Sequence, residues 1–305
     1  MEPFKVNILG CGSALPTLRH YASSQVVEIR EKFYMIDCGE GTQVQLRRSH
    51  ISFTKISGVF ISHLHGDHCF GLIGLISSFG MLGRTATLHV YAPAEFGNML
   101  QSMMDMFCNG LEFKVEFHAI DTKKNQVIFE DRSLTVETIP LTHRIPCCGF
   151  LFKDKPTLPH IKRDMIDFYQ IPVCQINNIK AGADWIKDDG EVIPNARLVT
   201  PADAPRSYAY CSDTRYMPEL YKMIKNVNLL YHESTYIIAD KARAKLYNHS
   251  TSQQAAMVAR DANAKKLLLG HYSARYDDER IILNEAKEIF PNCCLTKEGD
   301  VFNVE

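Results

Sequence analysis

Short apolar segments alternate with glycine-rich turns throughout the first third of the chain. The segments are FKVNILGCGS, SQVVEIR, FYMIDCGEGTQ, ISGVFISHLHGDH and ATLHVYAP. Each is as long as a β-strand and rich in Val, Ile, Phe or Tyr, and two continue into a turn and a helical pattern, DCGEGTQVQLRR and HLHGDHCFGLIGLISSF. The pattern predicts an α/β fold whose polar residues gather at strand ends, where open α/β sheets usually carry their chemistry.

The same alternation returns in the second half of the chain. Strands are predicted in VIFEDRSLTVETIPLTH, RSYAYCSDT, NLLYHEST and KKLLLGHYSARY, and they lead to His143, Asp213, Glu233 and His271. Before the last of them, Thr251 is followed three residues later by Gln254, which predicts a capping box at the start of a helix. Polar residues therefore again follow the predicted strands.

Residues 153–195 interrupt this pattern. The segment is rich in Pro, Lys, Asp and Asn and has little periodicity beyond an amphipathic turn in IKRDMIDFY. We therefore expect a single domain over residues 1–305, with residues 153–195 inserted as a partly helical arm rather than as a second domain.

Composition narrows the classes of protein to consider. The 305 residues are 46% hydrophobic and 23% charged, which is ordinary for a globular chain that buries a sizeable core. No apolar run reaches the roughly 18 to 20 residues of a membrane helix, and MEPFKVNILG does not resemble a signal peptide. The ten cysteines include no C-x-x-C pair, which favours free thiols in a reducing compartment. We expect a cytoplasmic protein without a membrane partner.

The stretch SHLHGDHCF concentrates metal-binding side chains. It holds His63, His65, Asp67 and His68 within six positions, directly after an apolar strand. Imidazoles and carboxylates bind zinc and similar divalent ions, and a strand-to-helix turn allows them to converge. The first two histidines can reach one ion while Asp67 and His68 turn toward another. The spacing therefore predicts two ions.

Two ions need further ligands, and three candidates stand at the ends of other predicted strands: His143, Asp213 and His271. A carboxylate such as Asp213 has two oxygens and can bridge ions about 3.5 to 4 Å apart, as in two-metal hydrolysis. A chance surface cluster and a purely structural zinc site are the alternatives, although structural sites are usually closed and rich in cysteine. Five scattered histidines are predicted to have no chemical role: His20, His50, His89, His118 and His160.

These residues resemble the metal-binding motif of the metallo-β-lactamase superfamily. HLHGDH alone is common to the whole superfamily, including its thioesterases and lactonases. The chain as a whole is similar to the ribonuclease Z family, in motifs that span nearly its full length: ILGCGSALPT, DCGEGTQ, FISHLHGDHCFGL, PLTHRIPCCGF, YCSDTR, HEST, NHST and LGHYSARY. The resemblance implies a four-layer αβ/βα sandwich with an inserted arm.

The resemblance also implies roles for individual residues. Two Zn²⁺ ions per subunit are expected, or Mn²⁺ in their place. One ion would be held by His63, His65, His143 and Asp213, and the other by Asp67, His68, Asp213 and His271. A water shared by the ions would attack the phosphate, with Asp67 accepting its proton. His249 in NHST would donate a proton to the leaving 3′ oxygen, and Glu233 in HEST would orient that imidazole.

By the same resemblance, we expect the chain to be a zinc-dependent endoribonuclease that removes the 3′ trailer of precursor tRNA by phosphodiester hydrolysis. Short members of the family are homodimers that clamp the tRNA elbow with an inserted arm, which residues 153–195 match in place and length. The arm carries six positive and seven negative side chains, and the positive ones are densest in its first third. The candidate RNA contacts are Lys153, Lys155, Lys162 and Arg163.

Two other functions remain open from the sequence. Val173 and Cys174 stand where the arm of the family usually has a Gly-Pro step, so tRNA binding by this arm is itself a hypothesis. An arm that did not bind tRNA would favour a general phosphodiesterase of the same superfamily, acting on small esters. A non-catalytic zinc or RNA-binding protein is the other alternative, and the presence of ligands, base and proton donor together disfavours it.

Overall fold

The computed structural model describes residues 3–15 and 17–305, so Pro16 of the ILGCGSALPT motif lies outside the described residues. The chain separates into two compact units. The large unit extends to Lys153 and resumes over Arg206–Glu305, and the small unit consists of Asp154–Pro205. The small unit includes most of the segment that was predicted as an inserted arm.

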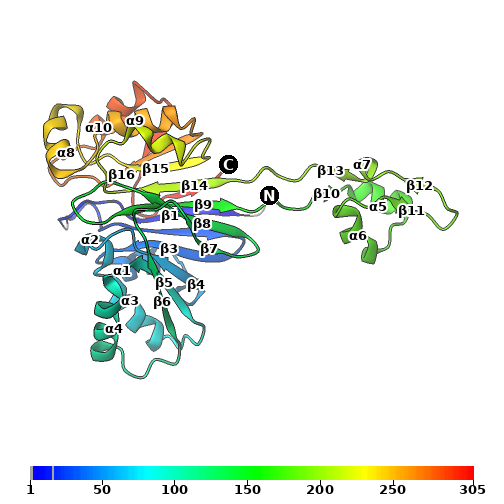
Figure 1. Ribbon diagram of the computed structural model, residues 1–305, viewed down its shortest axis with the longest axis horizontal. Coiled ribbons are helices and arrows are strands. Elements are labelled where there is room, and N and C mark those ends of the chain that lie inside the picture. Colours follow the sequence, from blue (N-terminus) through cyan, green and yellow to red (C-terminus); the bar gives the residue numbers. More distant parts are fainter. Residues whose placement is uncertain (1–2, 16) are drawn as a thin grey trace. The chain divides into compact units, whose positions relative to one another are not determined.

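Two seven-stranded β-sheets form the middle of the large unit (Figure 1). In spatial order the first sheet contains β18 (Val301–Asn303), β1 (Phe4–Gly10), β2 (Ser24–Ile29), β3 (Lys32–Cys38), β4 (Ile56–Phe60), β5 (Leu88–Pro93) and β6 (Val115–Ile120). The second contains β17 (Cys293–Leu295), β16 (Lys266–Gly270), β15 (Leu229–Glu233), β14 (Ser207–Cys211), β9 (Cys148–Asp154), β8 (Leu134–Pro140) and β7 (Val127–Glu130). Every strand predicted from the apolar pattern is present.

Parallel pairing brings several strand ends to the same edge of each sheet. β3, β4, β5 and β6 are parallel neighbours in the first sheet. β14, β15, β16 and β17 are parallel neighbours in the second sheet. The loops that leave β4, β14, β15 and β16 therefore start at the carboxyl ends of parallel strands, which is where α/β proteins usually build their sites.

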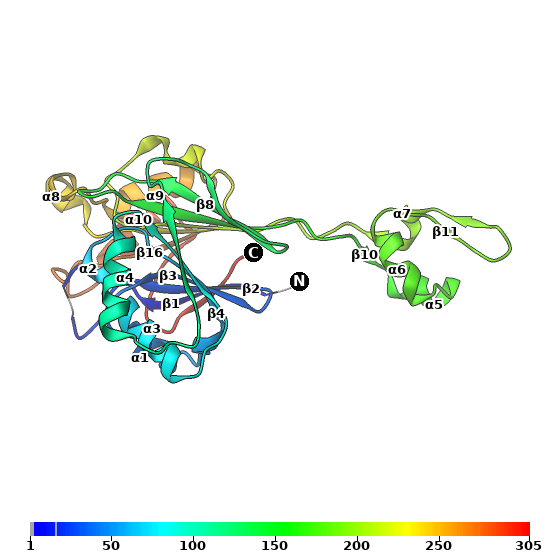
Figure 2. The same cartoon turned by 60° about the horizontal axis from the view of Figure 1, so that its bottom comes forward.

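Helices cover the outer faces of both sheets and complete the predicted four-layer αβ/βα arrangement (Figures 1 and 2). On the first sheet these are α1 (Thr42–Arg48), α3 (Leu72–Met81) and α4 (Phe96–Phe107), with the short α2 (Gly66–Cys69) at its end. On the second they are α8 (Lys241–Tyr247), α9 (Ser252–Asp261) and α10 (Arg280–Lys287). Short 3-10 turns occupy Phe53–Lys55, Pro218–Lys222 and Ile238–Asp240. Within the described part of the chain, every helix is too short or too polar to span a membrane.

Aromatic side chains fill the space between the sheets. Phe60 of β4 stacks on Tyr91 of β5 with ring centroids 4.6 Å apart, and it also contacts the rings of Phe150 and Phe152 in β9. Phe60, Phe150 and Phe152 are fully buried, and each such side chain contributes about 1.5 to 3 kcal/mol by leaving water. This packing fixes the sheets against each other and so fixes the loops at their shared edge.

The predicted capping box is present at the start of α9. Thr251 Oγ1 accepts the N–H of Gln254 at 3.3 Å, and Gln254 Oε1 accepts the N–H of Thr251 at 2.9 Å. The preceding helix, α8, is capped by Asn248, whose left-handed φ of 55° turns the chain away from the helix. The two helix ends hold His249 in the short connection between them.

The small unit consists of short elements around one apolar cluster. Its elements are β10 (His160–Ile161), α5 (Arg163–Tyr169), α6 (Val173–Lys180), β11 (Trp185–Ile186), β12 (Val192–Ile193), α7 (Asn195–Leu198) and β13 (Val199–Thr200). β10 pairs with β13, and β11 pairs with β12. The buried residues of the cluster are Ile171, Ile179, Ile193 and Leu198. The unit has more regular structure than its sequence indicated. The sequence shows little periodicity because the core residues come from different loops and helices instead of repeating along one element.

Candidate metal centre

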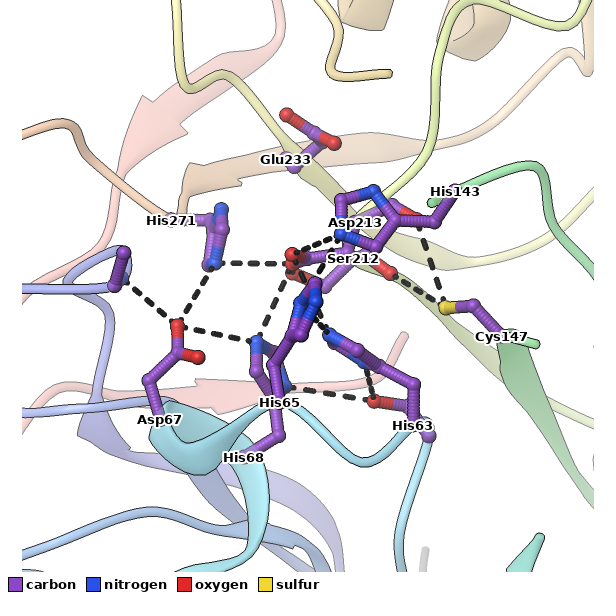
Figure 3. A network of polar contacts seen from close by, with 12 residues as sticks. His63, His65, Asp67, His68, His143, Cys147, Ser212, Asp213, Glu233 and His271 are labelled. Carbon is purple, nitrogen blue, oxygen red and sulfur yellow. Dashed lines mark hydrogen bonds and ion pairs between the residues drawn. The ribbon is translucent and has the colours of Figure 1, made fainter. Parts of the chain in front are cut away.

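All seven predicted metal ligands lie together in the large unit, where loops from the two sheets meet (Figure 3). The HLHGDH segment after β4 supplies His63, His65, Asp67 and His68. The loops after β8, β14 and β16 supply His143, Asp213 and His271, respectively. Residues far apart in the sequence thus form one site because their strands end at the same place.

Three residues of the centre adopt a left-handed backbone conformation at the end of a strand. Asp37, Asp213 and His271 have φ values of 56°, 62° and 60°. This conformation is uncommon for residues other than glycine and costs of the order of 1 to 3 kcal/mol each. All three side chains are buried and hydrogen-bonded, so their surroundings hold them in this conformation.

Three imidazoles meet one oxygen of Asp213. His65 Nδ1 lies 3.1 Å from His63 Nε2 and 3.2 Å from His143 Nε2. Asp213 Oδ2 lies 3.6 Å from His63 Nε2 and 3.5 Å from His143 Nε2. Ligand atoms of a tetrahedral zinc ion are separated by about 3.3 to 3.6 Å, given bonds of about 2.0 to 2.2 Å. These four atoms, the first cluster, therefore have the spacing of a tetrahedral metal site.

The other oxygen of Asp213 faces a second group of side chains. Asp213 Oδ1 lies 2.9 Å from His271 Nε2 and 3.3 Å from His68 Nε2. Asp67 Oδ2 lies 3.7 Å from His271 Nε2 and 3.5 Å from His68 Nε2, and it accepts the N–H of Ala14 at 2.8 Å. Asp67, His68, His271 and Asp213 Oδ1 form the second cluster. Asp213 thus belongs to both clusters through different oxygens.

Two buried nitrogen atoms provide a test of whether the centre suits a cation. The Nε2 atoms of His68 and His271 are buried and make no hydrogen bond of good geometry within the described residues, although both face Asp213. A buried polar atom in this state carries a desolvation cost, which coordination to an ion would offset. Imidazole and carboxylate are also the ligands that zinc and related ions prefer. The residues fit a divalent metal ion.

Burial sets the protonation state of the histidines in the first cluster. Burial is the largest cause of the pKa shift of each of these histidines. It lowers the pKa of His65 and His143, and it brings the pKa of His63 well below its usual range. Neutral imidazole is the form that binds a metal ion. The first cluster therefore presents its three nitrogen ligands ready for binding.

The histidines of the second cluster respond differently because carboxylates surround them. Burial opposes protonation of His68, but Asp37 and two further carboxylates raise its pKa well above the usual range. Burial opposes protonation of His271 as well, but the charge of Asp213 and the hydrogen bonds to Asp213 and Asp67 together outweigh it and raise the pKa to about 10. An ion that binds to the second cluster must displace protons from these rings.

Asp37 is a residue of the centre that the ligand pattern did not identify. Its Oδ2 accepts the Nδ1–H of His68 at 2.7 Å and the hydroxyl of Tyr210 at 2.7 Å. Ser62 donates its N–H and its hydroxyl to the same carboxylate, at 2.7 and 2.9 Å. A carboxylate on Nδ1 fixes the ring and leaves Nε2 for a metal ion. The position of Asp37 at the end of a predicted strand, in DCGEGTQ, is the signal that could have identified it.

Hydrogen bonds to the outer nitrogen also orient His143 and His271. His143 Nδ1 donates to the backbone carbonyl of Asn248 at 3.1 Å. His271 Nδ1 donates to Thr235 Oγ1 at 2.9 Å, and that hydroxyl donates to Glu233 Oε2 at 2.6 Å. Both rings consequently turn Nε2 toward Asp213. Thr235 and Asn248 belong to the HEST and NHST motifs, but their residue types do not indicate these roles, because neither is a charged group or a predicted metal ligand.

Glu233 connects the second cluster with His249. The Nδ1–H of His249 lies 3.0 and 3.1 Å from the two oxygens of Glu233, which is fully buried and also accepts the N–H groups of Thr214 and Ser250. Burial opposes protonation of His249, but the charge of Glu233 raises the pKa of the imidazole above its ordinary value. His249 also lines the cleft, so an imidazole whose protonation Glu233 favours faces the place where a ligand would bind.

The centre opens into a cleft of about 770 Å³. Leu18, Tyr21 and Phe70 give the cleft an apolar and aromatic wall, and Phe70 is 72% exposed. Arg144 adds a positive charge to the lining, and its guanidinium lies over the ring of Tyr247 at 4.7 Å. Aromatic surface next to positive charge suits a nucleic-acid strand, whose bases stack and whose phosphates pair with cations.

The candidate RNA contacts are divided between the two units. Lys153 lies in β9 of the large unit, where its Nζ donates to Glu137 at 2.6 Å. Lys155, Lys162 and Arg163 lie in the small unit. Lys162 Nζ donates to the backbone carbonyl of Arg197 at 3.0 Å, so the Lys162 side chain crosses toward α7.

Several known proteins are similar to this chain over all or nearly all of its length. A protein named Ribonuclease Z from Phocaeicola vulgatus is 57% identical over 305 residues, which are 100% of this chain and 99% of that protein. A protein of the same name from Porphyromonas gingivalis strain W83 is 49% identical over 290 residues, 95% of each chain. The crystal structure of human tRNase Z, short form (ELAC1), matches with a TM-score of 0.71 at 24% identity over 99% of both chains, which bears on the fold.

A further match covers part of the chain. Residues 4–164 match the family described as Anti-Pycsar protein Apyc1. This segment contains HLHGDH and His143 but ends before Asp213, Glu233, His249 and His271. The full-length relatives are therefore the more informative comparison, since they span both clusters of the metal centre.

Proposed function

Because this chain belongs to the ribonuclease Z family, we propose that it is a zinc-dependent endoribonuclease that removes the 3′ trailer of precursor tRNA by phosphodiester hydrolysis. Its residues 4–164 belong in addition to the Anti-Pycsar protein Apyc1 family. The first membership carries the proposal because the matches to those relatives extend over Asp213, His249 and His271, whereas the match to the second family ends at residue 164.

The main observation in support is that Asp213 faces both clusters. Its Oδ2 lies 3.5 Å from His143 Nε2, and its Oδ1 lies 2.9 Å from His271 Nε2. A carboxylate that serves two sets of nitrogen ligands suits a pair of ions about 3.5 to 4 Å apart. We therefore assign one Zn²⁺ to each cluster, with Mn²⁺ as an alternative metal.

Two bound ions would neutralise charge on the phosphodiester and lower the pKa of an attacking water. Asp67 is the proposed acceptor of that water's proton, because it lines the cleft and belongs to the second cluster. Burial opposes ionisation of Asp67, but the charge of His68 together with the hydrogen bond and charge of His271 outweighs it and lowers the pKa of the carboxyl group. Asp67 is therefore ionised at neutral pH and able to accept a hydrogen bond from water.

His249 is the proposed proton donor to the leaving 3′ oxygen. Its Nδ1 is bound by Glu233, so Nε2 is the nitrogen that remains for the substrate. The raised pKa of His249 increases the protonated fraction of the ring near neutral pH, and the protonated form is the one that a general acid requires. Glu233 acts through His249 and through the hydroxyl of Thr235, and thus positions two histidines with one buried carboxylate.

The small unit is the proposed contact for the body of the tRNA. Its own apolar cluster lets it fold compactly, and Lys155, Lys162 and Arg163 supply positive charge in its first part. Lys153 is a weaker candidate, because its charge is already paired with Glu137. A homodimer is part of this proposal, and sedimentation equilibrium of the purified protein would test it.

A cleavage assay tests the proposed reaction. The protein is incubated with a precursor tRNA that carries a 3′ trailer and, separately, with bis(p-nitrophenyl) phosphate, with and without a chelator and beside an Asp67→Ala variant. We expect chelator-sensitive removal of the trailer that the variant loses. Hydrolysis of the small ester alone would instead indicate a general phosphodiesterase, and RNA binding without any hydrolysis would indicate a non-catalytic protein.

A pair of charge reversals tests the role of the small unit. Replacing Lys162 and Arg163 together by Glu should raise KM for precursor tRNA about tenfold, flatten its dependence on salt, and leave hydrolysis of the small ester unchanged. The control carries the same change in charge on two exposed lysines of the large unit, Lys123→Glu with Lys225→Glu. Equal effects of the two double variants would contradict a specific contact through the small unit.

A further inference from the structure

A second group of metal-capable side chains lies on β5 and β6, outside the lining of the catalytic cleft. His89, Glu116 and His118 bring their ligand atoms within 4.8 Å of one another. His89 Nδ1 lies 3.0 Å from His118 Nε2 and 3.4 Å from Glu116 Oε2. Taken singly along the sequence, the two histidines predict no chemistry, and the structure brings them into contact.

Strand register explains why the three side chains share one face. In the parallel pair β5 and β6, His89 stands opposite Glu116, and Tyr91 stands opposite His118. Alternate residues of a strand point to the same side of a sheet. His89 therefore lies on the same side as Tyr91, whose ring belongs to the aromatic packing between the two sheets. The three side chains lie on this inner face, near the edge strand β6.

Neighbouring side chains hold two of the three groups in place. The ring of His118 stacks on Tyr91, with centroids 4.5 Å apart and an angle of 12° between the rings. Glu116 Oε1 accepts a hydrogen bond from Lys114 Nζ at 2.9 Å, which leaves Oε2 facing His89. Side chains that are already oriented lose little conformational freedom when they bind a metal ion.

The distances and the chemistry of these atoms suit a metal ion. Their separations of 3.0 and 3.4 Å are close to the roughly 3.3 Å expected between ligands of a tetrahedral zinc ion. Two facing imidazole nitrogens 3.0 Å apart share a single proton, which an ion can replace. Burial lowers the pKa of His118, and the neighbouring His89 lowers it further, which favours the neutral form that binds metals.

We propose that His89, Glu116 and His118 bind one Zn²⁺ or similar transition-metal ion at a site separate from the catalytic centre. Two imidazoles and one carboxylate with the remaining positions open to water are a common ligand set for such ions. The side chains of His89 and Glu116 are 36% and 39% exposed, so an ion can enter from solution. A bound ion would join the edge strand β6 to β5.

Equilibrium dialysis of the full-length protein against Zn²⁺ tests this site by counting the ions bound per chain. The His118→Gln variant should bind one equivalent fewer than the unchanged protein, and Glu116→Gln should bind that equivalent at least about tenfold more weakly. His50→Asn is the matched control, because His50 is exposed and has a left-handed φ of 55° that Asn tolerates. The control should bind as many ions as the unchanged protein.

Hydrolytic activity distinguishes this proposal from the proposed function. Both substitutions should leave hydrolysis of precursor tRNA and of the small ester unchanged, since neither residue lines the cleft. Unaltered zinc stoichiometry and affinity in the two variants would overturn the proposal, whatever the activity. If circular dichroism shows that His118→Gln does not fold, the affinity of Glu116→Gln for Zn²⁺ serves as the test of the proposal. That substitution removes only a charge from a half-exposed side chain.

Discussion

The two clusters of the metal centre share Asp213 but differ in their ligands. The first combines three imidazoles with one carboxylate oxygen, and the second combines two imidazoles with oxygens of two carboxylates. Nitrogen-rich sites favour zinc, whereas additional carboxylate oxygens also accommodate harder ions such as Mn²⁺. Two ions held by one shared aspartate therefore need not be equivalent. We expect Mn²⁺ to replace Zn²⁺ first in the second cluster.

The clusters also differ in the groups that orient their ligands. His143 of the first cluster is held by a backbone carbonyl, and His63 by the hydroxyl of Ser62. His68 of the second cluster is held by the carboxylate of Asp37. His271 is held by the hydroxyl of Thr235, which in turn donates a hydrogen bond to Glu233. Among the described residues, the second cluster is therefore the one that Thr235 and Glu233 link by hydrogen bonds to His249, the proposed proton donor.

The largest effect is expected from Asp213→Ala, which removes the one residue common to both clusters. Both ions should bind more weakly, and kcat/KM should fall at least about 10³-fold for precursor tRNA and for the small ester. Elemental analysis of metal content together with steady-state kinetics measures this. Asp105→Ala, at an exposed position of α4, is the control and should change neither. Retention of both ions in Asp213→Ala would contradict the shared-ligand assignment.

A matched pair of variants separates the clusters. His143→Ala should remove the ion of the first cluster and His271→Ala that of the second, each with a loss of activity of at least about 10²-fold. The Zn²⁺ and Mn²⁺ contents of each variant after dialysis against Mn²⁺ then show which cluster retains Zn²⁺ and which takes up Mn²⁺. Loss of both ions in both variants would mean that the clusters do not bind independently.

His249→Ala should affect the two substrates unequally. Loss of a general acid costs about 10² to 10⁴-fold when the leaving group is a poor one, as the 3′ oxygen of RNA is. The p-nitrophenolate ion leaves readily without a proton, so hydrolysis of the small ester should change little. Initial rates for both substrates at saturating metal measure the difference. An equal loss for both would assign His249 to structure or metal binding instead of proton donation.

The smallest effect is expected from Glu233→Gln, and it depends on pH. The charge of Glu233 raises the pKa of His249, so its removal lowers that pKa and the protonated donor is lost at a lower pH. The alkaline limb of the pH profile for precursor tRNA should therefore move to lower pH, with about a tenfold loss of kcat on that limb. An unmoved limb would show that His249 does not titrate in this range or does not donate the proton.

Much of the fold was predictable because its signals are local. Apolar strands, the turn in HLHGDH and the capping box of Thr251 and Gln254 all depend on residues a few positions apart. The seven candidate ligands could also be selected, since histidine and aspartate at strand ends are conspicuous in the sequence. Strand order and register, which decide whether such residues meet, are long-range properties.

The remaining features could not be predicted for the same reason. Asp37 stands at the end of a predicted strand, but its hydrogen bond to His68 joins residues far apart in the sequence, and so do the bonds of Thr235 to His271 and of the Asn248 carbonyl to His143. His89 and His118 are 29 positions apart and meet only through the pairing of β5 with β6. In the small unit, three isoleucines and Leu198 from separate short segments form the core, and they follow no periodic pattern in the sequence.

Electron paramagnetic resonance of the protein loaded with Mn²⁺ tests the central claim most directly. If Asp213 bridges two ions about 3.5 to 4 Å apart, the spectrum at two equivalents per chain will show a spin-coupled pair, which Asp213→Ala abolishes. Only the isolated Mn²⁺ signal at every loading, or a coupled signal that persists in Asp213→Ala, would contradict the account.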